Sequence, residues 1–391
     1  MKICILTPRF PFPENGGDVL RINNIARYLK SQGHQLLLVS FHDGNADADL
    51  AKSLYDKVFL VKRNKIVSAL NSLLFLLRGK PIQCGYYFSR SFGKMFRRVV
   101  SIEKPDRYLS HLLRMAPYIE REGLNDKSVV EMTDALSKTY AMVTHAKGSS
   151  LKKMIYIVER RLIGKYERHV AEYFPKVVLV SRDDVNFLKA NCPKQNSLSV
   201  HTNGVDIYPP NCDYSSGKIC FVGNMRTLQN QDAVLFFAKE VFPLIKKSRP
   251  DAKFYIIGAQ PSKEITDLGE ANSNIVVTGF VDDLYAQVKD SCFAVAPVRI
   301  AAGIQNKVLV AMAMGVPVVL SKLISSAIPE LKDGENCFVR SDADEIAKSC
   351  ILLMNDKSLR NKISKAGRQT VVDNYSWPEK LKGYMDIGAE F

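Results

Sequence analysis

Residues 296–319 decide the fold class, and they read APVRIAAGIQNKVLVAMAMGVPVV. An apolar run typical of a buried strand ends at Pro297, and a polar loop follows it. Helical periodicity then continues up to Gly315, and Pro317 opens another apolar run. A helix N-terminus behind a glycine loop attracts anions, and cationic side chains stand beside this one. We therefore predict a phosphate-binding loop formed by Arg299, Gly303, Ile304, Gln305 and Lys307.

The preceding residues repeat this strand–loop–helix pattern. Strands are expected at 217–222, 253–257, 275–278, 292–296 and 317–320, with helices between them, the first at 233–246. A polar loop, 223–230, follows the first strand and contains Gly223, Asn224 and Arg226. The guanidinium of Arg226 matches phosphate oxygens, and a solvated arginine is the alternative. Gly279, Phe280 and Val281 follow a later strand, where a glycine lets the backbone approach a flat base.

The first half has the same layout. Strand-like runs at 2–7 and 35–40 enclose a helical pattern that ends at Gly33. Gly16 and Gly17 precede that helix, where they form either a loop beside a diphosphate or sugar, or only a tight turn. Further strands are expected at 57–61, 107–110, 128–132 and 176–180, and a charged helix at 151–173. The chain is therefore predicted to be α/β, with two Rossmann-like domains facing across a cleft.

Basic charge is concentrated in the first half of the chain. Residues 1–205 hold 33 Lys and Arg against 18 Asp and Glu, whereas residues 206–391 hold 22 of each. The apolar segment 66–77 lies inside a stretch that is free of acidic residues from Lys57 to Arg98. This pattern predicts an interfacial helix on an anionic membrane, and a buried core helix with basic ends is the alternative. No nucleic-acid-binding motif is present, so nucleic acid is not an expected partner.

The chain lacks the sequence signs of secretion or of a membrane span. Its apolar N-terminus is too short for a signal peptide, and no apolar stretch reaches about 18 residues. The eight cysteines are spread singly, as in a reducing compartment, and show no zinc spacing. We expect a cytoplasmic protein, peripheral at the inner face of the cell membrane, without a metal or other cofactor.

Several of these motifs together resemble retaining glycosyltransferases of family 4, of the bacterial polysaccharide-pathway type, which have the GT-B fold. The resemblance is strongest over 217–340 and rests on the N-terminal Gly-Gly loop, 203–206, 279–281, 303–319, 328–336 and 375–377. It implies a first domain at 1–205 on the acceptor side, a nucleotide-sugar domain at 206–375, and a helix at 376–391 packing back on the first domain. It also implies sugar transfer from a nucleotide-diphosphate sugar to a saccharide or lipid-linked saccharide, in cell-surface polysaccharide synthesis.

The resemblance also suggests roles for individual residues. His111, after the expected strand 107–110, matches loosely a histidine that lies near the donor sugar in the family, and a structural histidine is the alternative. Arg114 stands near it. With Lys307 and Arg226 as stabilisers of the leaving diphosphate, His111 completes the predicted catalytic set.

The sequence departs from the family in two regions. In the loop 223–230, Asn224 and Gln229 stand where the family usually has Arg and Lys. Family members usually carry two glutamates around the helix of the phosphate loop, and here Ala302 and Val310 stand in their places. The second glutamate meets the ribose hydroxyls in the family, so Val310 at the donor site lacks that hydrogen-bond acceptor. A catalytically weak or silent GT-B scaffold is therefore one alternative, and a sugar-nucleotide epimerase is the other.

Overall fold

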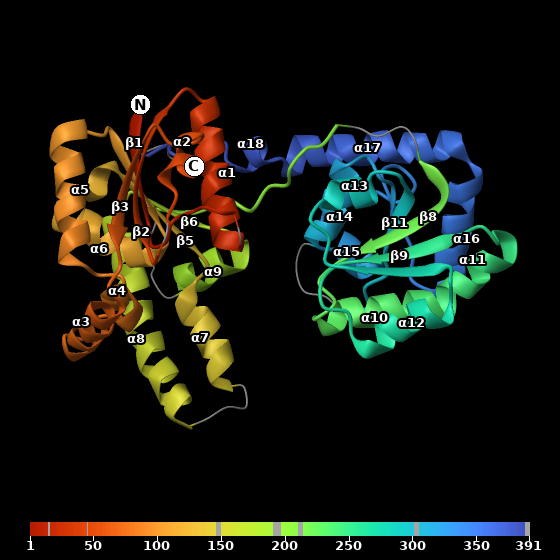
Figure 1. Ribbon diagram of the computed structural model, residues 1–391, viewed down its shortest axis with the longest axis horizontal. Helices are drawn as coiled ribbons and strands as arrows, with labels where there is room; N and C mark the ends of the chain where they lie inside the picture. The colour runs from red at the N-terminus through yellow and green to blue at the C-terminus, as the bar shows by residue number, and fades with distance from the viewer. Residues whose placement is uncertain are drawn as a thin grey trace. The chain divides into compact units, whose positions relative to one another are not determined.

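A computed structural model describes residues 1–14, 16–44, 46–145, 150–190, 197–209, 214–300 and 305–387. The chain divides into two compact units, Met1–Asn203 with Lys380–Phe391 and Gly204–Glu379. Each unit holds one parallel sheet with helices on both faces (Figure 1). The predicted α/β class with two Rossmann-like domains is confirmed.

The first unit is built on a seven-stranded sheet in the order β3-β2-β1-β4-β5-β6-β7. Its strands are β1 (Lys2–Thr7), β2 (Gln35–His42), β3 (Lys57–Lys62), β4 (Arg107–His111), β5 (Ser128–Thr133), β6 (Lys176–Leu179) and β7 (Leu198–Val200). Its helices are α1 (Gly17–Ser31), α2 (Ala48–Lys52), α3 (Lys65–Leu77), α4 (Ile82–Tyr86), α5 (Arg90–Glu103), α6 (Ala116–Arg121), α7 (Leu136–His145), α8 (Ser150–Tyr173) and α9 (Arg182–Ala190). Central strands buried on both faces read as continuous apolar runs, which is why the sequence identified them.

The helix α3 projects away from this sheet together with α4 and the far ends of α7 and α8 (Figure 1). Asn64 caps it by accepting hydrogen bonds from the backbone N–H groups of Ile66 and Val67. Its aliphatic side chains are between 44% and 75% exposed at Ile66, Val67, Leu70, Leu73, Leu74 and Leu77. The alternative of a buried core helix is therefore wrong.

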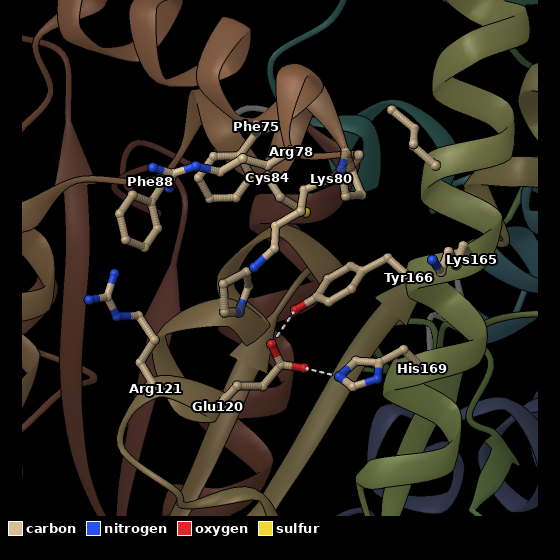
Figure 2. Close-up of a pocket in the computed structure, with 14 residues that line it drawn as sticks. Phe75, Arg78, Lys80, Cys84, Phe88, Glu120, Arg121, Lys165, Tyr166 and His169 are labelled. Carbon is tan, nitrogen blue, oxygen red and sulfur yellow. Dashed lines mark hydrogen bonds and ion pairs between the residues drawn. The ribbon is translucent and has the colours of Figure 1, made fainter.

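A pocket of about 530 Å³ opens where α3 ends, between the turn that follows it, α6 and α8 (Figure 2). Its walls combine aromatic rings such as Phe75 and Phe88 with several cationic side chains. None of the helices in the described part of the chain has both the length and the apolar character needed to span a bilayer.

The second unit is built on a six-stranded sheet in the order β10-β9-β8-β11-β12-β13. Its strands are β8 (Ser215–Val222), β9 (Lys253–Ile257), β10 (Ile275–Gly279), β11 (Ser291–Ala296), β12 (Val318–Leu320) and β13 (Phe338–Val339). Its helices are α10 (Leu228–Phe236), α11 (Phe242–Ser248), α12 (Lys263–Ala271), α13 (Leu284–Val288), α14 (Asn306–Ala313), α15 (Lys322–Ser325), α16 (Ala343–Asn355), α17 (Lys357–Tyr375) and α18 (Trp377–Lys380). In Figure 1, α10 and α12 cover one face of the sheet, while α14 and α17 lie on the other.

Two expected elements differ from the observed ones. The loop expected over 223–230 ends earlier, because α10 begins at Leu228, and a π-helical turn, Phe237–Val241, separates α10 from α11. The helix expected over 376–391 is limited to the four residues of α18 within the described residues. The chain after α18 continues in turns, so it lacks the repeating hydrogen bonds of a longer helix.

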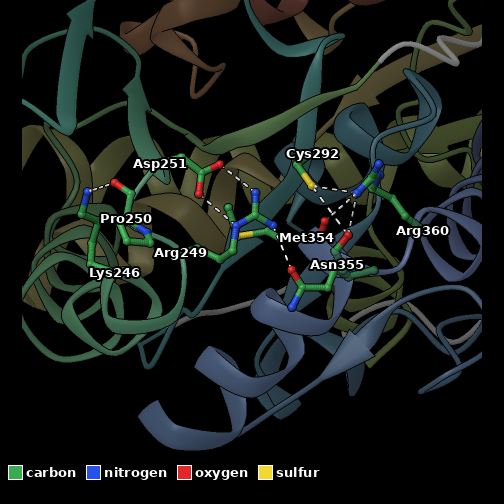
Figure 3. A network of polar contacts seen from close by, with 9 residues as sticks. Lys246, Arg249, Pro250, Asp251, Cys292, Met354, Asn355 and Arg360 are labelled. Carbon is green, nitrogen blue, oxygen red and sulfur yellow. Dashed lines mark hydrogen bonds and ion pairs between the residues drawn. The ribbon is translucent and has the colours of Figure 1, made fainter.

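A buried arginine ties the base of the second sheet to its helices (Figure 3). Arg360 donates to the carbonyl of Leu353 at 2.7 Å and contacts the sulfur of Cys292 at 3.4 Å. It thereby satisfies a C-terminal carbonyl of α16 that has no partner within the helix. Arg249 nearby pairs with Asp251 through two hydrogen bonds of 2.9 and 2.7 Å. These contacts fix the end of the unit opposite the site described below.

Candidate functional site

In the second unit, three neighbouring strands end in hydrogen-bonded glycines. The N–H of Gly223 donates to the carbonyl of Ile257 at 3.0 Å, and the N–H of Gly258 donates to the carbonyl of Gly279 at 3.0 Å. A Cβ on Gly258 would lie 1.8 Å from the carbonyl oxygen of Gly223, so only glycine fits there. The carboxyl ends of β8, β9 and β10 therefore form a tight backbone surface, where ligands of parallel α/β sheets bind.

The loop after β8 is held by its own amides. Asn224 accepts a hydrogen bond from the N–H of Arg226 at 3.0 Å, and the side chain of Asn230 donates to the carbonyl of Asn224 at 2.8 Å. The buried side chain of Met225 anchors the loop in the core. Arg226 is left exposed, with no ion pair to any residue that the structure describes.

Lys307 lies in the first turn of α14 and reaches toward the same edge. Its ammonium contacts Asn230 Oδ1 and lies 4.6 Å from the centre of the Phe221 ring. Burial lowers the pKa of Lys307 to about 8. Within the described residues no carboxylate pairs with this cation, so the site has an uncompensated and partly desolvated positive charge.

Arg299, by contrast, is already paired. It makes two hydrogen bonds to Asp232, at 2.6 and 3.0 Å, and its guanidinium lies 4.5 Å from the centre of the Phe236 ring. Its charge is therefore compensated within the protein. Asp232, in α10, was not expected to take part.

The remaining predicted donor residues have different surroundings. Gly279 has a φ of +69° and open space around it, Phe280 is exposed, and Val281 packs partly on the core. Gln305 is buried at the N-cap of α14, and Val310 packs partly on the core from the same helix. Gly303 and Ile304 lie outside the described residues. The structure thus brings Gly223, Asn224, Gly279 and Lys307 to one edge, where Asn230 contacts both Asn224 and Lys307.

In the first unit, His111 ends β4 within a buried polar chain. Its Nδ1 lies 2.9 Å from Glu131 Oε2, and Arg21 Nε donates to Glu131 Oε1 at 2.9 Å. Burial alone would raise the pKa of Glu131, but the charge of Arg21 and the His111 hydrogen bond outweigh it and lower the pKa to about 2. An ionised carboxylate cannot donate, so Nδ1 of His111 carries the proton.

The other nitrogen of His111 differs from Nδ1 in its surroundings. Its Nε2 is buried and has no hydrogen-bond partner among the described atoms. A buried polar atom without a protein partner is costly, so a water molecule or a ligand group is expected to bind it. Glu131 and Arg21 thus hold the imidazole with one nitrogen available to a ligand.

Gly16 and Gly17 lie at the neighbouring strand end, since β1 pairs with β4 in register Leu6 with Ser110. Gly16 has a φ of +116°, and a Cβ there would lie 2.9 Å from Arg9 Nη2. A Cβ added to Gly17, the first residue of α1, would meet no described atom within 4 Å, so the helix N-terminus is open to a ligand.

Sequence reasoning missed Glu131, Arg21 and Asn230. Glu131 interrupts the apolar strand β5, and Arg21 interrupts the apolar face of α1, which was the available signal. Charged residues are almost never fully buried unless they are paired. A charged residue at such a position therefore predicts a buried partner, but not which one.

Residues 216–356 match the family model described as glycosyl transferases group 1. A relative from Klebsiella pneumoniae, described as an uncharacterized 44.6 kDa protein in the cps region, is 23% identical over 390 residues, covering 96% of each chain.

Solved structures similar to the chain cover nearly all of it. A mutant of TarM from S. aureus, in complex with fondaparinux, alpha-GlcNAc-glycerol and UDP, superposes with a TM-score of 0.61 at 12% identity, covering 98% of this chain and 99% of that one. HepE from Anabaena, in complex with UDP, superposes with a TM-score of 0.59 at 15% identity, covering 98% of each chain. The fold is GT-B, and the matched domain together with this fold supports a glycosyltransferase.

Proposed function

We propose that the protein moves a sugar from a nucleotide-diphosphate sugar to a saccharide or lipid-linked saccharide acceptor in cell-surface polysaccharide synthesis. Support comes from the group 1 match over the donor-side unit and from neighbours that are described with bound UDP. The relative from the cps region supports a polysaccharide pathway. The resemblance to family 4 supports retention of the anomeric configuration.

The observation that carries the proposal is the environment of Lys307. Its ammonium is partly desolvated, stands in the first turn of α14, and has an amide oxygen rather than a carboxylate as its described partner. A diphosphate would supply the missing negative charge and would also accept from the free N–H groups of the helix. Charge that develops on the leaving nucleotide is then stabilised by a group already in place.

Arg226 and the glycine-ended strands complete the donor site of the proposal. The exposed guanidinium of Arg226 is free to bind a phosphate in a fork geometry. The base lies beside Gly279, where a positive φ and open space allow close approach. No metal or other cofactor takes part in this mechanism, since the side chains of the chain provide the cations.

His111 acts on the sugar in this proposal. Its unpartnered Nε2 accepts a hydrogen bond from a sugar hydroxyl, while Nδ1 stays fixed on Glu131. The acceptor enters on the side of the first unit, whose basic charge and exposed α3 favour an anionic membrane. The protein then works as a peripheral protein on the inner face of the cell membrane.

A donor panel tests the proposal. Thermal shift and calorimetry with UDP-, GDP-, ADP- and CMP-sugars should identify one donor class, and nucleotide release should follow when an acceptor extract is added. Lys307→Ala should weaken donor binding at least tenfold, about the value of one charge-assisted hydrogen bond. Lys348→Ala, which removes an exposed lysine of α16, serves as the matched control. No binding and no turnover with any donor would overturn the enzyme proposal in favour of a silent scaffold.

A further inference from the structure

The pocket at the end of α3 has more positive charge than its surroundings compensate. Arg78, Lys80, Arg121 and Lys165 contribute to its walls, and all four residues are exposed. No carboxylate forms an ion pair with any of them in the described part of the chain. In Figure 2, Arg78 and Lys80 lie on one side of the pocket and Arg121 on the other.

The one carboxylate of the pocket is already engaged. Glu120 accepts a hydrogen bond from the hydroxyl of Tyr166 at 3.0 Å, and its other oxygen lies 3.1 Å from His169 Nε2. These contacts turn the acidic group toward α8 (Figure 2). The four cations therefore remain available to an anionic ligand.

Aromatic rings hold two of the cations in position. The guanidinium of Arg121 lies 5.0 Å from the centre of the Phe88 ring, and the ammonium of Lys80 lies 6.0 Å from that of Phe75. Such contacts orient a cation without neutralising it. Arg121 and Lys80 are thus oriented by aromatic rings that also line the pocket.

An exposed apolar face runs along α3 to the end of the helix where the pocket opens. Leu70, Leu73 and Leu77 are more than half exposed on the side of α3 opposite Phe75, and Arg78, which follows them at the end of the helix, lines the pocket. Exposed aliphatic side chains in this number mark an interaction surface. The combination of an apolar face with a cationic cavity at its end fits a molecule that has a hydrocarbon chain and an anionic head.

We propose that this pocket binds the diphosphate of a lipid-linked acceptor, with the hydrocarbon chain along the exposed face of α3. The inference rests on the proposed function and names the site that would hold its acceptor. A volume of about 530 Å³ is of the size of small-molecule sites and larger than one phosphate needs. Four cations match the two or more negative charges of a diphosphate better than the single charge of a phospholipid phosphodiester.

Binding of farnesyl diphosphate, a short soluble lipid diphosphate, tests the proposal without any donor or turnover. Calorimetry should show that it binds more tightly than farnesol or inorganic diphosphate alone. The variant Arg78→Gln/Lys80→Gln should lose at least tenfold in affinity, on the scale of one charge-assisted hydrogen bond. The variant Leu73→Ser/Leu77→Ser should weaken farnesyl diphosphate binding but leave inorganic diphosphate binding unchanged.

Controls separate a specific pocket from general electrostatics. Arg98→Gln/Lys357→Gln removes the same charge from exposed positions away from the pocket and should keep the wild-type affinity. Equal losses in both double variants, or no binding of farnesyl diphosphate, would overturn the proposal. Thermal unfolding of each variant checks that the fold is intact.

Vesicles of phosphatidylglycerol distinguish the two sources of lipid phosphate. If Arg78→Gln/Lys80→Gln abolishes vesicle binding and farnesyl diphosphate does not compete with the vesicles, the pocket serves a bilayer phospholipid and the proposal is wrong. Donor affinity is measured in the same variants and should stay at the wild-type value. If the wild-type protein binds farnesyl diphosphate but no sugar nucleotide, only the proposed function is contradicted, since the lipid measurement needs no donor.

Discussion

Nδ1 of His111 lies 2.9 Å from Oε2 of Glu131, and neither residue is more than 2% exposed. The other oxygen of Glu131 is occupied by Arg21 and by the hydroxyl of Thr133 at 2.9 Å. Every polar atom of the glutamate thus has a partner, whereas Nε2 of His111 has none that the structure describes. Glu131 is a positioning residue for His111, and its removal should act on the site through the histidine.

Glu131→Gln tests this relationship. The neutral amide leaves the buried Arg21 without a counter-charge, so the free energy of unfolding should fall by about 3–5 kcal/mol. Urea denaturation measures this loss. Glu103→Gln removes a carboxylate of a more exposed ion pair and should change little.

The same variant also separates positioning from a merely structural role. If Glu131 fixes the imidazole, Glu131→Gln should lower kcat and shift the pH profile of kcat, with KM for the donor changed less. A stable variant with an unchanged pH profile would show that Glu131 has only a structural role.

The lowered pKa of Lys307 predicts that donor binding depends on pH. Its pKa of about 8 in the folded protein lies below its ordinary value of about 10.4. Donor affinity should therefore fall about tenfold between pH 7 and pH 9, as the ammonium is lost. Lys307→Arg keeps its charge over this range and should flatten the profile, which calorimetry at both pH values measures. Equal losses in wild type and Lys307→Arg would contradict the role.

Without a donor, the free energy of unfolding should change with pH in the direction opposite to donor affinity. Between pH 8 and about 10.4 the unfolded chain binds more protons at this lysine than the folded chain does. The free energy of unfolding contributed by Lys307 should consequently rise with pH over that window. Comparison of urea denaturation of wild type and Lys307→Met isolates this contribution.

Two glycines at the strand ends of the second unit should respond differently to alanine. A Cβ at Gly258 meets the carbonyl oxygen of Gly223 at 1.8 Å, so Gly258→Ala should lower the free energy of unfolding by about 3 kcal/mol or more. Gly279 has open space around it, and only its φ of +69° resists a side chain. Gly279→Ala should therefore lower the free energy of unfolding by only about 1–2 kcal/mol. Equal losses of stability in the two variants, measured by chemical denaturation, would refute the close approach of Gly258 to the carbonyl of Gly223.

Val310→Glu tests the departure in α14. A carboxylate there gains hydroxyl partners if a ribose lies beside the helix, and donor affinity should rise about tenfold. Val310→Met, of similar apolar character, should leave donor affinity unchanged. A rise in donor affinity with a large gain in turnover would favour a damaged site in the natural chain. No change with glutamate would place the ribose elsewhere.

Sequence periodicity predicted most of the elements. Apolar runs such as Ile3–Leu6 became fully buried strands, and the glycine and proline signals around 303–319 correctly separated a strand, a helix and the next strand. These signals are local, because a helix or a buried strand repeats over a few residues. The sequence could not indicate that α10 begins at Leu228, since polar residues are typical of both loops and first helical turns.

The sequence alone determined the two α/β domains, the glycines at the strand ends of the second unit, and the basic first half with its apolar segment 66–77. Only the tertiary structure decided which charges meet. Arg21 and Glu131 are 110 residues apart, Lys307 and Asn230 are 77 apart, and the walls of the cationic pocket come from α3, α6 and α8. Partners so distant in sequence leave no periodic signal, because packing of the sheet and helices brings them together. That packing pairs Arg299 with Asp232 but leaves Lys307 without a carboxylate partner among the described residues. It also leaves Nε2 of His111 without a hydrogen-bond partner among the described atoms.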